Sequence, residues 1–276
     1  MIRFLLPGLT LATHAAAACS RAALQEVTAS YIRAQTSGKP DELHLASNAT
    51  YAENDKPMSI TTGVLSQAIT IDFSRSIHDT VECATFTELT AATSPHPYVI
   101  HTRMIVSPAA AANMTPEITA IESVVTDQGD WIFNATSHLY WTQQEKWDPI
   151  PESQRDTRET IKAAADAYLD QWANSTLPVP LGTPCARLEG GIYTGQRDPA
   201  ANTCRMPAFP VPIRAGNRRY VIDEELGAVD VFNGFPWLEA TNTDAAMPSS
   251  NLVRVEGGLI RYIHEVTVCE TTMCGR

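Results

Sequence analysis

The chain has 276 residues, of which 44% are hydrophobic, and a formal net charge of -11. This length allows two domains of ordinary size, and the hydrophobic content allows a sizeable core and argues against disorder. The acidic balance, without a cluster of Lys and Arg, argues against nucleic acid and against an anionic membrane surface as partners.

Residues 1–18 have the three regions of a secretory signal peptide. Arg3 precedes an apolar run over residues 4–12, and small residues follow up to Ala18. We predict cleavage after Ala18. No later apolar stretch approaches the ~20 residues that a membrane-spanning helix needs, so no membrane insertion is expected. The predicted location is outside the cell or in a vesicle of the secretory pathway.

Four Asn-x-Ser/Thr sequons support this routing. They lie at Asn48, Asn113, Asn134 and Asn174. We interpret them as N-glycosylation sites, which places them at the surface of a secreted protein. The alternative is that they are accidental in a cytosolic chain.

Six cysteines in an oxidising compartment predict three disulfides. Of the many possible pairings we select Cys19–Cys83, Cys185–Cys204 and Cys269–Cys274. No C-x-x-C, H-x-x-x-H or H-E-x-x-H spacing is present, so no metal is predicted.

Two segments, 22–34 and 157–172, have apolar residues at helical spacing and are predicted to be helices. The apolar positions are Leu24, Val27 and Tyr31 in the first and Ile161, Ala165, Tyr168 and Trp172 in the second. Thr157 can cap the second helix at its N-terminus.

Strands are expected after each helix, because residues 98–106 and 220–222 are rich in β-branched residues. Two hairpins are also expected. The first leads from residues 118–125 through a turn at Gly129 into residues 131–133. The second leads from residues 252–255 through a turn at Gly258 into residues 259–268.

The same order of elements occurs twice, which predicts two α+β units over residues 19–146 and 153–276. Similar phrases at 48–54 (NATYAEN) and 189–195 (EGGIYTG) place Tyr51 and Tyr193 at matching positions. A linker is predicted at residues 147–152, where two prolines exclude a continuing helix or central strand.

Residues 252–264 (LVRVEGGLIRYIH) resemble the closing hairpin of SnoaL-like, or nuclear-transport-factor-two-like, domains. Residues 187–195 (RLEGGIYTG) and 218–223 (RRYVID) also resemble a family of secreted fungal proteins of unassigned function with two such units. The resemblance implies two tandem cone domains of α+β class, each a curved antiparallel sheet packed on helices. Proteins with the SnoaL-like fold include cofactor-free cyclases, dehydratases and isomerases, ligand binders and dimerisation scaffolds, so the fold alone does not fix the chemistry.

In the second unit, Asp230 lies between two valines and must find a partner or raise its pKa. Strand alternation puts His264 on one face with Ile260, Tyr262 and Val266. We predict an Asp230–His264 acid–base pair in the cone. The alternative is a structural hydrogen bond at its open rim.

In the first unit the catalytic candidates are Tyr51 and His101, which alternation allows to point into the cone. A tyrosine in this place can donate a proton, or it can be a core residue bonded to the backbone. The residues predicted to contact a ligand are Glu53, Tyr193, Tyr262 and Phe232.

These expectations favour a secreted, cofactor-independent lyase or isomerase (a dehydratase, cyclase or pericyclase such as a Diels–Alderase) acting on a hydrophobic secondary metabolite. Neither G-x-G-x-x-G nor a P-loop is present, so no cofactor is predicted. The partner would be a small hydrophobic molecule, and a homodimer is left open. The alternative is a non-catalytic secreted binding protein or effector, because a dry pocket can bind without reacting.

Overall fold

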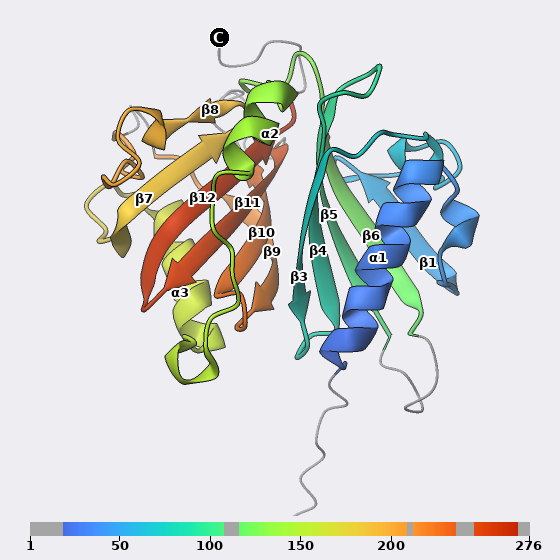
Figure 1. The fold of residues 1–276 in the computed structure, drawn as a ribbon, viewed down its shortest axis with the longest axis horizontal. Coiled ribbons are helices and arrows are strands. Elements are labelled where there is room, and N and C mark those ends of the chain that lie inside the picture. Colours follow the sequence, from blue (N-terminus) through green and yellow to red (C-terminus); the bar gives the residue numbers. More distant parts are fainter. Residues whose placement is uncertain (1–18, 108–115, 209–211, 236–245, 270–276) are drawn as a thin grey trace, which may run out of the picture.

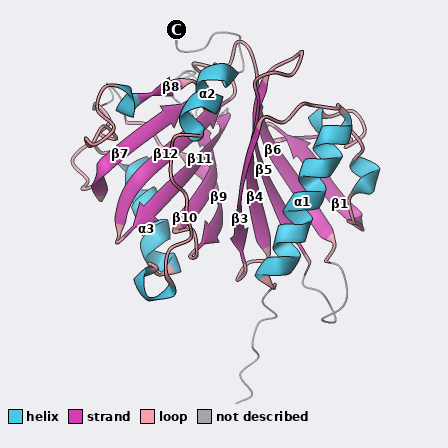
Figure 2. Ribbon diagram, viewed as in Figure 1, coloured by secondary structure: helices cyan, strands magenta, loops and turns pink. Residues whose placement is uncertain are grey.

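The computed structural model describes residues 19–107, 116–208, 212–235 and 246–269. Two six-stranded sheets stand face to face, and each carries a long helix on the side away from the other sheet (Figures 1 and 2). The expected α+β class with two units is therefore present.

Both units share one topology. The first contains helix α1 (Arg21–Ser37) and a sheet in the order β2-β1-β6-β5-β4-β3, and the second contains helix α3 (Arg158–Asp170) and a sheet in the order β8-β7-β12-β11-β10-β9. The strands of the first unit are β1 (Leu45–Glu53), β2 (Lys56–Pro57), β3 (Phe73–Asp79), β4 (Ala84–Ala91), β5 (Tyr98–Val106) and β6 (Ile118–Thr126). Those of the second are β7 (Leu181–Glu189), β8 (Ile192–Tyr193), β9 (Gly216–Asp223), β10 (Ala228–Phe235), β11 (Met247–Glu256) and β12 (Leu259–Thr267). Single-turn helices lie at η1 (Pro40–Glu42), η2 (Val64–Ser66), η3 (Glu152–Gln154) and η4 (Thr194–Gln196).

The prediction of purely antiparallel sheets was wrong at one pair of strands in each unit. β1 runs parallel to β6, and β7 runs parallel to β12, while the other pairs are antiparallel. Side-chain alternation reports which residues share a face, but it carries no information on the direction of the neighbouring strand.

Both predicted helices are confirmed, with ends set by local chemistry. The Ser20 side chain accepts a hydrogen bond from the Ala23 N–H at 3.2 Å and begins α1, which ends at Gly38 in the left-handed conformation (φ 67°). Thr157 caps α3 as expected, accepting from the Thr160 N–H at 3.3 Å.

One predicted hairpin is confirmed and the other was wrong. β11 and β12 are joined through Gly257 and Gly258, both with positive φ. In the first unit β6 ends at Thr126, and the chain then enters helix α2 (Ala135–Thr142) instead of a strand at residues 131–133. Asn134 favours the helix because its side chain accepts the Ser137 N–H at 3.0 Å.

Each sheet is buried on both faces. One apolar cluster lies between α1 and the first sheet, and a second lies between α3 and the second sheet. A third cluster lies between the sheets. Its buried members are Ile77, Ala84, Phe86, Val99, Val124, Ala135, Val221, Ala228, Phe232, Leu252 and Val266. The inner face of each sheet is therefore the face that meets the other sheet.

Two reciprocal ion pairs join the units across the β3–β9 edge. Both nitrogens of the Arg21 fork donate to Asp223 at 2.9 Å, and both nitrogens of the Arg158 fork donate to Asp79 at 2.7 Å. Arg21 and Arg158 are each the first residue of their helix. In each ion pair the first helical residue of one unit binds the last strand residue of the other unit. This reciprocal arrangement is typical of a two-fold symmetric dimer, but here it occurs within one chain.

Each of these carboxylates also accepts a backbone N–H from the opposite unit. Asp223 accepts from His78 at 2.9 Å, and Asp79 accepts from Ile222 at 3.0 Å. Both carboxylates are fully buried and therefore need hydrogen-bond partners inside the protein. Each one finds them in a guanidinium and in backbone N–H groups at the strand edge.

Residues 147–152, the predicted linker, pack against the protein. The Trp147 ring stacks on Tyr262, and the Ile150 N–H donates to the backbone carbonyl of Glu225 at 2.7 Å. This segment therefore packs on the second unit.

The predicted disulfides Cys19–Cys83 and Cys185–Cys204 are confirmed. The third falls partly outside the described residues, because Cys274 is not among them. Two disulfides fit an extracellular protein. Within the described ranges, no helix is long and apolar enough to cross a membrane.

Asn48, Asn134 and Asn174 are exposed, which leaves room for glycans, whereas Asn113 and residues 1–18 lie outside the described residues. Glycosylation and the signal peptide stay predictions.

Replacing Asp79 by Ala should destabilise the protein by about 3 kcal/mol. The substitution leaves the partly buried guanidinium of Arg158 and the Ile222 N–H of the other unit without their acceptor. Denaturant unfolding measures this loss. The control is Glu26→Ala, which removes an exposed ion pair with Arg33 and should cost less than about 0.5 kcal/mol. Equal, small losses in both variants would contradict the role assigned to Asp79.

Candidate functional sites at the sheet interface and in the first unit

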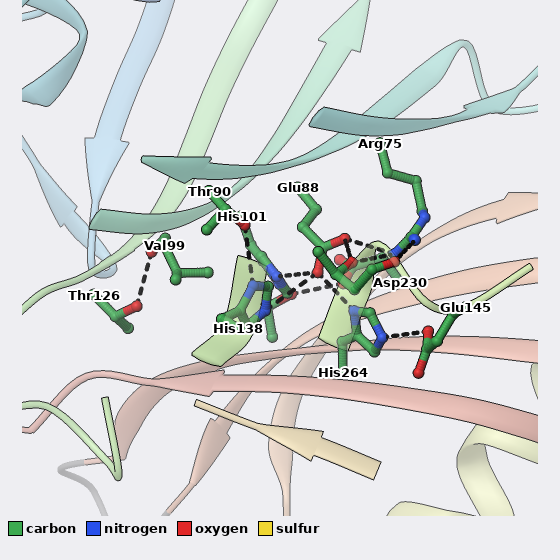
Figure 3. A network of polar contacts seen from close by, with 12 residues as sticks. Arg75, Glu88, Thr90, Val99, His101, Thr126, His138, Glu145, Asp230 and His264 are labelled. Carbon is green, nitrogen blue, oxygen red and sulfur yellow. Dashed lines mark hydrogen bonds and ion pairs between the residues drawn. The ribbon is translucent and has the colours of Figure 1, made fainter. Parts of the chain in front are cut away.

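Three histidines converge on one carboxylate between the two sheets (Figure 3). Glu88 lies on β4, His101 on β5, His138 on α2 and His264 on β12, and all four side chains are fully buried. Glu88 Oε1 is 2.7 Å from His264 Nδ1, 3.5 Å from His138 Nε2 and 3.6 Å from His101 Nε2. We call these four residues the Glu88 cluster.

His264 lies between two carboxylates. Its Nδ1 contacts Glu88 and its Nε2 contacts Glu145 Oε2, each at 2.7 Å. Burial alone would lower the pKa of His264, but the charges and hydrogen bonds of Glu145 and Glu88 raise it to about 9. Arg75 donates to the other Glu88 oxygen at 2.7 Å. Burial alone would raise the pKa of Glu88, but the charges of His264 and Arg75 hold this pKa well below its usual value.

His101 is connected to Asp230 through a serine. Ser250 Oγ donates to Asp230 Oδ1 at 2.6 Å, and it lies 2.8 Å from His101 Nδ1. Ser250 thus links the His101 ring to Asp230, and the tautomer of His101 decides which partner donates in the contact between Nδ1 and Ser250 Oγ. Burial raises the pKa of Asp230 to about 8, and the serine hydrogen bond and nearby arginines only partly offset this.

His138 is held by Thr90, whose Oγ1 lies 3.0 Å from His138 Nδ1. Burial lowers the pKa of His138 to about 3 and also lowers that of His101, so both rings are neutral at pH 7. Their Nε2 atoms are buried and have no hydrogen-bond partner among the described residues. Glu88, His138 and His264 are the residues that could hold a metal, since their ligand atoms all lie within 4.8 Å of one another.

The predicted Asp230–His264 pair does not form. The register places Asp230 opposite Leu252 and Leu252 opposite His264, so the two residues lie two strands apart in the same row. Both point to the other sheet, away from the helix-bearing face. Alternation shows that they share a face, but both faces are buried, and the sequence does not tell which face the helix covers.

A β-bulge also changes the predicted face of β12. The β11–β12 register shifts between Arg254 and Val255, which places Ile260 with Ile263 in the cluster under α3. His264 and Val266 both lie on the inner face, so the prediction that these two residues share a face is confirmed.

The ligand-contact candidates of the second unit also lie outside its helix-side core. Tyr193 stacks on Trp141 with ring centroids 4.5 Å apart, and Phe232 lies in the inter-sheet cluster. Tyr193 does not correspond to Tyr51. Tyr51 lies two residues before Glu53, the last residue of β1, and the residue at that place in β7 is Arg187.

Tyr51 and Glu53 do meet, on the helix side of the first sheet. The Tyr51 hydroxyl donates to Glu53 Oε1, which also accepts the Val64 N–H. Burial raises the pKa of Tyr51, and the hydrogen bond to Glu53 raises it further. A Cβ on Gly63 would overlap Glu53 Oε1 and the Tyr51 ring, so this close approach requires glycine.

Glu53 lines a cleft of about 360 Å³, which we call the first-unit cleft. The lining residues are mostly polar and come from β1, η2, β5, β6 and the turn after β6. The segment that follows β12 of the second unit also contributes. The lining residues are Glu53, Asn54, Thr62, Gly63, Val64, Gln67, Tyr98, Val125, Asp127, Gln128, Gly129, Asp130, Val268 and Cys269. A larger cleft of about 610 Å³ lies between residues 146–151 and β11–β12.

Sequence reasoning missed four members of the interface network, Arg75, Glu88, His138 and Glu145. Glu88, between Thr87 and Leu89, carries only a weaker form of the signal used for Asp230, a carboxylate between two valines. The other three have no such signal, because their partners lie far along the chain.

Residues 154–267 match a domain of unknown function, DUF8021. This region corresponds to most of the second unit. No curated protein and no solved structure matches the chain.

The pKa of Asp230 leads to a pH-dependent stability. In the folded state Asp230 keeps its proton up to about pH 8, whereas in the unfolded state, with a pKa near 3.8, it releases the proton. The free energy of unfolding therefore falls as pH rises between these two values. Asp230→Asn should remove up to about 1.4 kcal/mol per pH unit of this slope in denaturant unfolding. Asp41→Asn, at an exposed site, should leave the slope unchanged. Equal slopes in wild type and Asp230→Asn would show that Asp230 titrates normally.

Proposed function

We propose that the protein is a secreted, cofactor-independent lyase or isomerase that transfers a proton in the first-unit cleft. The observation that carries this proposal is the Glu53 carboxylate at the wall of that cleft, held by the Tyr51 hydroxyl behind it and by the Val64 N–H. The resemblance to SnoaL-like cone domains supports it, because cofactor-free members of that fold act from polar groups inside the cone.

Glu53 is the proposed general base. Two donors, Tyr51 and the Val64 N–H, fix the orientation of its carboxylate before substrate binds. The raised pKa of Tyr51 keeps the phenol protonated, so its role is that of a donor. In the proposed reaction Glu53 removes a proton from carbon, and the electron pair moves onto a neighbouring substrate oxygen. Tyr51, whose single hydroxyl proton is donated to Glu53, holds the carboxylate in place.

The lining of the cleft indicates the class of substrate. Glu53, Asp127 and Asp130 supply three carboxyl groups, and the described lining includes no Lys, Arg or His. Such a cleft favours a small polar molecule that is neutral or positively charged. The proposed substrate therefore departs from the hydrophobic metabolite expected from the sequence.

Solvent deuterium exchange tests this activity. A panel of small hydroxy-ketones, amino-ketones and β-keto esters in D₂O, followed by proton NMR, should include a compound whose acidic C–H exchanges faster with the protein present. Glu53→Gln should slow that exchange by about 10²–10⁴-fold, since this is the usual contribution of a general base.

Glu117→Gln, at an exposed carboxylate away from the cleft, is the matched control and should exchange like wild type. Equal rates for Glu53→Gln and wild type would remove Glu53 from the mechanism. Binding of a panel compound without exchange would favour the alternative, a secreted small-molecule binding protein.

A further inference from the structure

We propose that Glu88, His138 and His264 bind a divalent transition-metal ion between the two sheets, with His101 Nε2, 3.6 Å from Glu88, next to the ion. This site is separate from the first-unit cleft and does not depend on the proposed activity there. These four residues come from β4, α2, β12 and β5, so they have no common sequence motif.

The donor set suits such an ion. Two or three imidazoles and one carboxylate are ligands that zinc and iron share, and ligand atoms around a tetrahedral ion lie roughly 3.4 Å apart at the usual bond lengths of about 2.1 Å. Glu88 Oε1 already lies 3.5 Å from His138 Nε2 and 3.6 Å from His101 Nε2. The 2.7 Å contact between Glu88 and His264 must widen as the ion replaces the proton between them, and the ligand atoms of Glu88, His138 and His264 already lie within 4.8 Å of one another.

The far nitrogen of each ring is held by a second residue. His264 Nε2 contacts Glu145, His138 Nδ1 contacts Thr90, and His101 Nδ1 contacts Ser250. Metal-ligating histidines in proteins are oriented in this way, with the free nitrogen bonded to a carboxylate, hydroxyl or carbonyl. Arg75 similarly holds the second oxygen of Glu88.

Two nitrogen atoms of the cluster are unexplained without an ion. His101 Nε2 and His138 Nε2 are buried and have no hydrogen-bond partner, although a buried polar atom nearly always has one. When His101 Nδ1 carries the ring proton toward Ser250, the His101 Nε2 lone pair faces the Glu88 carboxylate, which is also an acceptor. A cation placed between them satisfies both.

The burial of the site indicates a structural role for the ion. All four side chains are fully buried, as in closed structural sites, where the protein fills every coordination position. Glu88 and His101 belong to the first unit, His264 to the second, and His138 to the helix that packs against both. The ion would therefore fasten the two units together.

The test uses the full mature chain, secreted and stripped of metal by a chelator. Zinc titrated into the stripped protein should bind with a stoichiometry of about one and raise the unfolding temperature by about 5 °C or more at saturation. Cobalt should bind at the same place and show the visible absorption of a tetrahedral site.

His138→Gln should weaken zinc binding by about 100-fold or more and abolish the cobalt spectrum. Glu145→Gln, which changes a positioning residue, should weaken binding by about 10–100-fold. The matched control is His78→Gln, because His78 is also buried but bonds Thr28 away from the cluster, and it should bind zinc like wild type.

Folded wild-type protein that takes up neither zinc nor cobalt overturns the proposal, and so does equal zinc affinity in His138→Gln and wild type. If His138→Gln does not fold, the wild type alone decides, since an unfolding temperature unaffected by zinc also overturns it.

Discussion

The burial of charge between two sheets is the constraint on which the rest of the structure depends. Asp79 and Asp223 have no exposed surface, and each must satisfy an arginine and a backbone N–H from the other unit. A buried carboxylate without these partners would cost several kcal/mol. The two units are therefore held in one register, with the inner faces of their sheets in contact. That contact creates the enclosed space in which Glu88 meets three histidines.

The inter-sheet layer differs from an ordinary apolar core. Leu252, Phe86 and Phe232 fill part of it, but Glu88, His264 and Asp230 lie among them, each with a polar partner. Replacing such networks by apolar residues is often neutral or stabilising, so stability alone does not explain them. A ligand-binding role gives these residues a reason to be present.

The two units share a topology but differ in chemistry at equivalent positions. In the first, Glu53 lines a cleft, and the buried Tyr51 donates a hydrogen bond to it. In the second, Arg187 takes the place of the tyrosine and pairs with Glu189 at 2.7 Å, and Tyr168 and Trp172 fill the space under the sheet. The same fold can therefore carry a reactive pair in one copy and serve as a partner surface in the other.

Local features of the sequence determined the helices, the β11–β12 hairpin, the two-unit organisation and two disulfides, because caps, glycine turns and periodicity act within a few residues. The sequence also identified Asp230 as a carboxylate in need of a partner, and His264 and His101 as catalytic candidates. Strand direction, the face covered by each helix and the partners of these groups depended on the tertiary structure. Glu88 lies 176 residues from His264 along the chain, and a contact at that separation is fixed only when the two sheets stack. The alternating sequence pattern of a strand is the same whether a residue faces a helix or a second sheet, so the pattern does not distinguish the two.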